Sequence, residues 1–363
     1  MIVIFALWCA RFDFGRKVSA AVIALITGAI FSNIGLLPHA SRVYELIVVY
    51  LVPFAVALLL FKANLRQVVT HTGGLVFVFL VCVSGTVLGA FGGFLLLPLG
   101  SEAAKLLGVF IATYTGGSMN FVAVSQALEF NDGGLLSAAL ASEAIVGTGY
   151  LVLLALTAAS TWFMRQFPPK SDLSVSTAPL NTEASRYKSK HPGWFGIALV
   201  ILLASGICWF SFFIAQYFSI SRFSLLFITL FAVLTANLMP RQLGAVRGDF
   251  EIGMFLMYVF FVVVGAGADI SILFTFGPVL MVYAAIICLI HVLFTLTVGK
   301  LFRFNYAELI TASNACILGP APAAALAAHH KWHSLVTPAL LCGILGYVIA
   351  NFIGVSVALR LGG

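Results

Sequence analysis

Long apolar runs follow one another along almost the whole sequence, and they constrain its fold more than any other feature. Twelve segments can be read, at about 1–10, 17–36, 44–62, 74–99, 105–129, 134–162, 194–217, 221–241, 249–266, 277–299, 305–330 and 333–360. About 20 apolar residues are enough for a helix to cross the hydrocarbon core of a bilayer. Since only helices and closed barrels satisfy their backbone hydrogen bonds in lipid, the sequence predicts an all-α polytopic membrane protein.

The composition agrees with lipid as the main solvent. Of the 363 residues, 62% are hydrophobic and 9% are charged, whereas about 25% are charged in soluble domains. This excludes a soluble globular domain, a disordered chain and a coiled coil. The net charge of +7 does not indicate a nucleic-acid partner, because no basic cluster is interleaved with aromatic residues. The six cysteines lie in apolar stretches without metal-ligand spacing, so we expect buried, unpaired thiols.

A polar stretch divides the segments into six and six. We expect an N-terminal transmembrane repeat at 1–165, a polar cytoplasmic linker at 166–193 and a C-terminal transmembrane repeat at 194–363. The fifth segment of each half is interrupted by helix-breaking residues, at Thr115–Ser118 and at Leu318–Pro322. The third segments end in similar sequences, Ala63-Asn64-Leu65 and Ala268-Asp269-Ile270. Both sixth segments contain a Gly-Tyr pair, Gly149-Tyr150 and Gly346-Tyr347. These matches favour an internal duplication.

The positions of Lys and Arg predict how the segments cross. If every segment crosses except the fifth of each half, which enters and returns on one side, only Arg42, Lys105, Arg222 and Arg360 of the 19 basic residues lie outside the cytoplasm. If both fifth segments cross completely, only seven basic residues are cytoplasmic. Basic residues favour cytoplasmic loops. We therefore predict two inverted repeats of about five transmembrane helices, each with a re-entrant hairpin broken at mid-membrane; discontinuous crossing helices are the alternative.

The residues before and around the first break carry a resemblance to a known family. They are Val52-Pro53 through Arg66, and Ala112-Thr113-Tyr114-Thr115-Gly116-Gly117-Ser118-Met119-Asn120-Phe121-Val122-Ala123-Val124, in which Gly-Gly-Ser-x-Asn-Phe is the most specific element. They resemble the bacterial and plastid membrane-protein family labelled domain of unknown function 819, over nearly the whole chain. The resemblance implies the architecture of inverted-repeat, cation-coupled transporters, and it implies no particular substrate.

The two interrupted segments are the predicted substrate site. A helix broken in lipid frees backbone groups that need protein, water or a ligand as a partner. The helix that begins at Ser118 directs its positive end into that space, which suits a carboxylate. Tight packing through small residues is the alternative interpretation. The predicted substrate-binding residues are Tyr114, Thr115, Gly116, Gly117, Ser118, Asn120, Ser313, Asn314, Gly319, Pro320 and Pro322.

Acidic residues are few in the apolar segments, so each is informative. Glu143 lies at mid-depth, where a lone ionised carboxylate costs at least about 2.5 kcal/mol. We predict that Glu143 serves as the ion-coupling site, with Asp269 as a second candidate. The alternatives are a neutral Glu143 held by a neighbouring hydroxyl, and simple solvation at the membrane interface for Asp269 and Glu308.

The other polar residues favour structural roles. We expect His291 to be a hydrogen-bonded interior histidine, and Asn237 and Asn351 to form interhelical hydrogen bonds. Lys62 is expected to extend its ammonium group to the interface. The cluster of His329, His330 and His333 favours a wet interfacial turn over a metal site.

Together these patterns predict a secondary active transporter for a small, carboxylate-bearing solute, such as an amino acid, short peptide or organic acid, driven by Na⁺ or H⁺. The last four segments of each half would move against a static scaffold. No HExxH motif and no GxxxxGK[ST] loop occurs, so neither an enzyme nor an ATP-driven pump is predicted, and no cofactor is expected. A cation/proton antiporter or channel without organic cargo is the alternative. The expected location is the bacterial plasma membrane, and a homodimer is left open.

Overall fold

A computed structural model describes residues 1–10, 12, 20–130, 132–158, 160–167, 194–246, 248–267 and 270–363. Within these ranges every regular element is a helix. Seven helical stretches of the described chain are long and apolar enough to cross a membrane: Arg42–His71, Leu75–Leu96, Gly133–Ala158, Phe195–Tyr217, Asp249–Ala266, Thr275–Leu301 and His333–Arg360. The prediction of an all-α polytopic membrane protein is confirmed. The predicted linker, apart from residues 166 and 167, lies outside the described residues, as does Asp269.

The helices follow the predicted segments closely. The first half contains α1 (Ile2–Cys9), α3 (Ala20–Asn33), α4 (Arg42–Leu46), the π-helical turn η1 (Ile47–Leu51), α5 (Val52–Leu60), α6 (Leu65–His71), α7 (Leu75–Leu96), α8 (Ala103–Gly116), α9 (Ser118–Ala127), α10 (Gly133–Ala158) and α11 (Thr161–Gln166). The second half contains α13 (Trp194–Tyr217), the 3₁₀ turn η2 (Ser221–Phe223), α14 (Ser224–Leu238), α15 (Pro240–Ala245), α16 (Asp249–Ala266), α17 (Ile270–Leu301), α18 (Tyr306–Ile317), α19 (Pro320–His329) and α20 (His333–Arg360).

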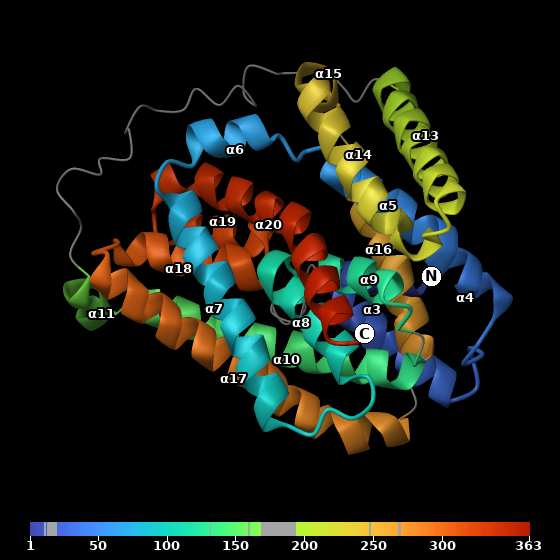
Figure 1. The fold of residues 1–363 in the computed structure, drawn as a ribbon, viewed down its shortest axis with the longest axis horizontal. Coiled ribbons are helices and arrows are strands. Elements are labelled where there is room, and N and C mark those ends of the chain that lie inside the picture. The colour runs from blue at the N-terminus through green and yellow to red at the C-terminus, as the bar shows by residue number, and fades with distance from the viewer. Residues whose placement is uncertain are drawn as a thin grey trace.

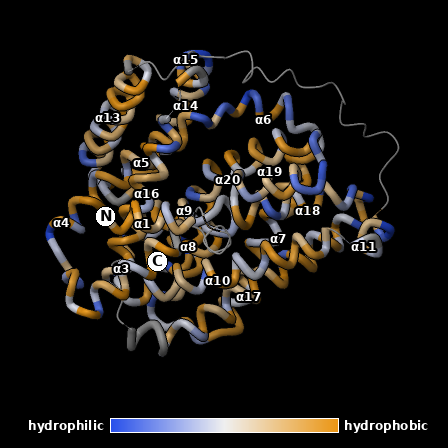
Figure 2. The backbone as a smooth tube through the Cα atoms, turned by 180° about the vertical axis from the view of Figure 1, so that it is seen from behind, coloured by the Kyte–Doolittle hydropathy of each residue, from blue (hydrophilic) through white to orange (hydrophobic). Residues whose placement is uncertain are grey.

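The helices form two groups that lie side by side (Figure 1). The panel consists of α1, α3, α4, α5, α13, α14 and α16, and the central bundle consists of α7 to α10 and α17 to α20. Apolar residues cover the helices of both groups, and hydrophilic residues gather in the short helices α6 and α15 (Figure 2).

The third segment of each half, α5 or α16, packs in the panel, so the prediction that the last four segments of each half form one body was wrong. Glycines of the third segment of the second half explain this placement. A Cβ at Gly265 would lie 2.0 Å from the carbonyl oxygen of Leu25 on α3, and one at Gly253 would lie 2.8 Å from Cγ of Leu59 on α5. Because α16 approaches α3 and α5 this closely, it belongs with them.

A glycine stripe joins α7 to α17 in the central bundle. A Cβ at Gly85, Gly89 or Gly93 would lie within 3.3 Å of α17 atoms. The Cβ at Gly89 would lie 2.7 Å from the carbonyl oxygen of Ile287. The two helices run antiparallel, since Phe77 near the start of α7 contacts Phe302 beyond the end of α17. Spacing of four residues places all three glycines on one helix face.

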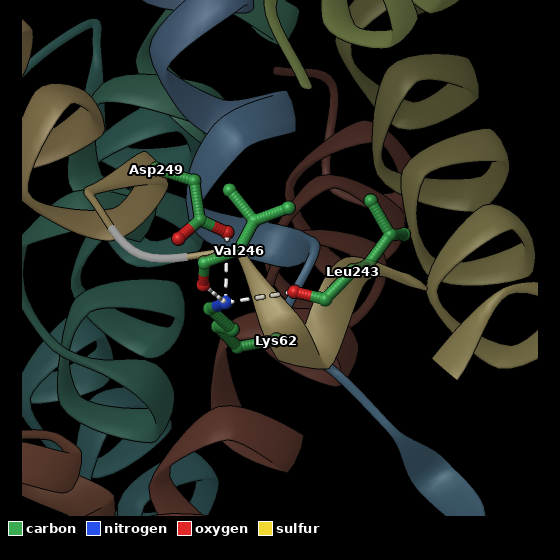
Figure 3. A network of polar contacts seen from close by, with 4 residues as sticks. All are labelled: Lys62, Leu243, Val246 and Asp249. Atoms are coloured by element: carbon green, nitrogen blue, oxygen red, sulfur yellow. Dashed lines mark hydrogen bonds and ion pairs between the residues drawn. The ribbon is translucent and has the colours of Figure 1, made fainter. Parts of the chain in front are cut away.

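Lys62 forms an ion pair and two hydrogen bonds, and the position of its ammonium group at the membrane interface stays a prediction. Its Nζ atom lies 3.1 Å from Oδ2 of Asp249 and donates hydrogen bonds to the carbonyl oxygens of Leu243 (2.9 Å) and Val246 (2.8 Å) (Figure 3). The Asp249 side chain is 1% exposed and the Lys62 side chain 27%. The ammonium group thus contacts a buried carboxylate and two carbonyl groups at the end of α15.

The predicted interhelical roles of Asn237 and Asn351 are confirmed. Asn237 on α14 accepts from the backbone N–H of Leu65 (2.9 Å) and donates to the carbonyl oxygen of Ala63 (3.0 Å). Asn351 on α20 donates to Oγ1 of Thr229 on α14 (3.3 Å). The cysteines are unpaired thiols as expected, and all but Cys9 are buried.

Candidate functional site

Both predicted helix interruptions are present, and a glycine forms each one. Gly117 separates α8 from α9 with φ 92° and ψ 171°. Gly319 precedes α19 with φ 89° and ψ −174°. A side chain at either position would be strained, because this backbone region is populated almost only by glycine. The two breaks therefore share one backbone conformation, although 202 positions separate them in the sequence.

The two breaks meet inside the central bundle. A Cβ at Gly117 would lie 3.5 Å from the carbonyl oxygen of Leu318 and 3.6 Å from Cα of Gly319. A Cβ at Gly319 would lie 3.6 Å from the carbonyl oxygen of Gly116. Two helix C-termini and two helix N-termini thus end at one place, so partial negative and positive charges from four helix ends surround it.

The arms of the first interruption fold back on each other. Lys105, near the start of α8, donates from Nζ to the carbonyl oxygen of Glu129, just beyond the end of α9 (3.4 Å). A Cβ at Gly108 would lie 3.1 Å from Cδ1 of Leu128. Across the second interruption, Nδ2 of Asn314 donates to the carbonyl oxygen of Pro322 (3.3 Å). The outer ends of α8 and α9 therefore lie together.

Glu143 on α10 lies beside both breaks. Its side chain is buried, and Oγ of Ser118 lies 3.2 Å from Oε1 and 3.1 Å from Oε2. A Cβ at Gly147, one turn along α10, would lie 3.6 Å from Oε1 of Glu143 and 3.4 Å from Cδ2 of Leu318. A hydroxyl can donate to an ionised carboxylate and accept from a protonated one. The pair therefore accommodates both protonation states of Glu143.

The remaining predicted substrate residues lie around the same place, most of them buried. Nδ2 of Asn120 donates to the carbonyl oxygen of Gly346 on α20 (3.3 Å). Oγ1 of Thr115 and Oδ1 of Asn314 are buried and have no hydrogen-bond partner within the described part of the chain. A buried oxygen left unpaired costs about 1–3 kcal/mol. These two oxygens, with the Glu143 carboxylate, are the atoms best suited to a cation, a water or a polar ligand group. Tyr114, Gly116, Ser313 and Pro320 are also buried, and Pro322 is partly exposed.

A buried chain of hydrogen bonds adds residues that sequence reasoning missed. His291 on α17 is fully buried; its Nδ1 lies 2.9 Å from Oγ1 of Thr86, and its Nε2 lies 2.8 Å from Oγ of Ser313. Ser313 in turn lies 2.5 Å from the hydroxyl of Tyr150. The interior, hydrogen-bonded role predicted for His291 is confirmed. The matched Gly-Tyr pairs pointed to Tyr150, whereas no sequence signal marked Thr86.

The histidine turn between α19 and α20 forms no metal cluster among the residues that the structure describes. His330 stacks on Trp332 with ring centroids 5.0 Å apart and packs edge-on against His329. Burial and the neighbouring His329 lower the pKa of His330 below its ordinary value. This arrangement fits the interfacial turn that the sequence favoured.

The fold and the site define an all-helical, multi-pass membrane protein with two interrupted helices that meet in its interior. A family model described as "Protein of unknown function (DUF819)" matches residues 2–362, and the chain belongs to this family. It is 34% identical over 370 residues to the "Uncharacterized membrane protein YjcL" of Bacillus subtilis (strain 168), covering 96% of this chain and 93% of that protein. The resemblance read from the sequence is confirmed.

Proposed function

We propose that the protein is a secondary active transporter of the plasma membrane, built from two inverted repeats whose re-entrant hairpins, α8–α9 and α18–α19, hold the cargo between their tips. The contact between Gly117 and Gly319 beside Glu143 is the observation that carries this proposal. Broken helices that meet in a bundle interior are typical sites for substrates and coupling ions in transporters. The proposed activity is transport and involves no chemical conversion.

The ends at which the two hairpins open support the proposed inversion. Antiparallel α7 and α17 finish at opposite ends of the bundle, and short connections lead from them into α8 and α18. At the start of α18, Tyr306 stacks on Phe167 at the end of the first half, and their ring centroids are 5.7 Å apart. The start of α8 lies near the end of α20, where a Cβ at Gly363 would be 3.3 Å from Cβ of Ala104. Each hairpin thus opens toward a different end.

The site suits an anionic cargo and a coupling cation. The N-termini of α9 and α19 present backbone N–H groups to a carboxylate, although Pro320 contributes no donor. Glu143 takes up Na⁺ or H⁺, which offsets the cost of a carboxylate in the bundle interior. Cation binding neutralises Glu143, so the cargo carboxylate then meets no like charge there and is stabilised by the two helix N-termini.

Flux measurements in proteoliposomes test this function. We expect purified protein to accumulate small carboxylates under a Na⁺ or H⁺ gradient. Glu143→Gln should reduce gradient-driven accumulation at least about tenfold, because it removes a charged partner worth roughly 1.5–3 kcal/mol. Glu45→Gln, the same change at an exposed residue of α4, is the matched control and should retain the flux. No flux of any carboxylate under either gradient, with folded protein, would overturn the proposal.

A cation/proton antiporter without organic cargo is the second candidate, favoured by the close pairing of Glu143 with a single hydroxyl. Ser118→Ala does not separate the two functions, since Ser118 contacts Glu143 directly. The direct measurement is Na⁺-triggered proton efflux from liposomes that contain no organic solute. Efflux there would favour the antiporter, and a strict requirement for carboxylate would favour the transporter.

A further inference from the structure

An apolar cavity of about 210 Å³ lies between α10, α17 and α18. Its walls include Leu154 of α10, Val292 of α17, and Leu309 and Ile310 of α18. An apolar cavity of about 150 Å³ is large enough to bind benzene. The volume therefore suits an aromatic ring or a branched aliphatic chain.

One wall of the cavity contains two hydroxyl groups that pair with each other, and the surface of the cavity is almost entirely apolar. Tyr150 and Ser313 both line the cavity and lie 2.5 Å apart through their hydroxyl oxygens. The buried His291 fixes Ser313 from behind at 2.8 Å. Ser313 also lies on the arm that leads to the break at Gly319. The cavity is thus connected by one helix arm to the place where the hairpin tips meet.

The other half of the molecule is closed at the corresponding position. There α20 packs along α8 with backbone contact, since a Cβ at Gly354 would lie 2.5 Å from the carbonyl oxygen of Gly108, and one at Gly346 would lie 2.5 Å from that of Thr115. In the first half, α10 packs mainly along α17 and far less along α18, which leaves the cavity between α10 and α18. The α8–α20 contact is therefore closed, whereas the matching α10–α18 contact leaves a space. This difference is expected of a transport passage that opens to one side of the membrane at a time.

We propose that this cavity receives the apolar part of the cargo, so that the transported solute is a carboxylate bearing an aromatic or branched aliphatic group. The inference rests on the proposed transport function and specifies its substrate class. The carboxylate lies toward the hairpin tips, beyond Ser313, and the apolar group occupies the space between Val292 and Leu309. Cargo of this shape buries only its apolar group against the apolar walls and keeps its charge at the hairpin tips.

Ligand-dependent thermal stability of the purified protein tests the inference without a variant. The probes are propionate, 4-methylpentanoate, 3-phenylpropionate and the uncharged 3-phenyl-1-propanol. We expect 3-phenylpropionate and 4-methylpentanoate to bind at least about tenfold more tightly than propionate, because burial of the larger group removes more apolar surface from water. Equal affinities for all three acids would overturn the inference. Equal binding of the alcohol would overturn it as well, since the cavity would then accept any apolar molecule, including a lipid chain.

Two neighbouring positions on α17 provide a matched pair of variants. Val292→Trp fills the cavity and should abolish the preference for 3-phenylpropionate over propionate. Leu293→Trp places the same side chain on the outer face, where Leu293 is 56% exposed, and should keep the preference. Loss of the preference in both variants would contradict the assignment. Selective binding of 3-phenylpropionate without flux would overturn the transport function and still support the cavity as the ligand site. Flux of propionate without selectivity would support the transport function and overturn the cavity as the ligand site.

Discussion

The pairing of Ser118 with Glu143 shows how a carboxylate can be kept inside a lipid-embedded bundle. The hydroxyl lies nearly equidistant from both carboxylate oxygens, at 3.2 and 3.1 Å. It sits at the first residue of α9, where the helix dipole also favours negative charge. Among the described residues the carboxylate is paired with a hydroxyl and with no cationic group, which fits the proposed uptake of an ion.

Removal of that hydroxyl should weaken ion coupling. In Ser118→Ala the carboxylate loses its donor, and we expect the ion concentration for half-maximal uptake to change about 5- to 30-fold, equivalent to roughly 1–2 kcal/mol for one such hydrogen bond. Ser118→Thr keeps the hydroxyl and is the control. Identical ion dependence in Ser118→Ala and the parent protein would show that the contact is incidental.

The ion pair of Lys62 and Asp249 should be structural, since it lies at the end of the panel away from the hairpin tips. Lys62→Met leaves a carboxylate that is 1% exposed without its cation. Breaking a fully buried pair costs about 3–5 kcal/mol; because Lys62 is partly exposed, we expect about 1–3 kcal/mol and a lower Tm. Lys300→Met, at an exposed site on α17, is the control.

A double variant tests whether the unpaired Asp249 carboxylate causes the loss of stability in Lys62→Met. Lys62→Met with Asp249→Asn removes both charges, and its Tm should lie above that of Lys62→Met alone. If the single and double variants melt together, the carboxylate is not what destabilises the single variant, and the ionic interpretation fails.

Among the helices, the glycine stripe of α7 controls how closely the two halves approach. Gly89→Ala places a methyl group 2.7 Å from the carbonyl oxygen of Ile287. The helices must separate, and we expect a loss of about 1–3 kcal/mol in the free energy of unfolding. Gly149→Ala on α10 is the matched control, because nothing lies within 4 Å of its Cβ. Thermal unfolding in detergent measures both, and equal Tm values would refute the packing argument.

The sequence predicts where helices begin and end better than it predicts which helices pack against each other. Gly117 and Gly319 interrupt helices where helix-breaking residues are adjacent, in Gly116-Gly117 and Gly319-Pro320, and the two breaks were therefore predictable. The contact between the breaks, and that of Lys62 with Asp249, join residues far apart in the chain with no periodic signal between them. The packing of α5 and α16 in the panel likewise depends on which helix each glycine faces. The hydropathy of an apolar segment does not indicate this.

At the scale of the whole molecule, the motion that the proposed transport function requires is a displacement of the panel against the central bundle. Hydrogen bonds that cross between them include Ser137 Oγ to the carbonyl oxygen of Val264 (2.6 Å) and Asn351 to Thr229 (3.3 Å). Packing within each group is far more extensive than packing between them. Rigid-body displacement of one group against the other is therefore the motion that breaks the least packing.

A cross-link between the two groups should stop transport. In a background without native cysteines, Asn351→Cys with Thr229→Cys joins α20 to α14. We expect a short bifunctional thiol reagent to abolish uptake and to spare ligand binding. Phe77→Cys with Phe302→Cys lies within the central bundle, where the ring centroids are 6.0 Å apart, and uptake should survive the same treatment. Undiminished uptake in the first pair, with the cross-link verified, would show that the groups do not move apart.

The pairing of α7 with α17 and of α3 with α16 means that neither half has an interior of its own. The glycine-lined faces of α7 and α16 are covered by helices from the other half, so a half-length chain would expose those faces to lipid. Under the proposed duplication, an ancestral half-length chain would have paired two copies in opposite orientations to cover these faces. Fusion of two such copies would then fix both orientations in one polypeptide and let each copy diverge.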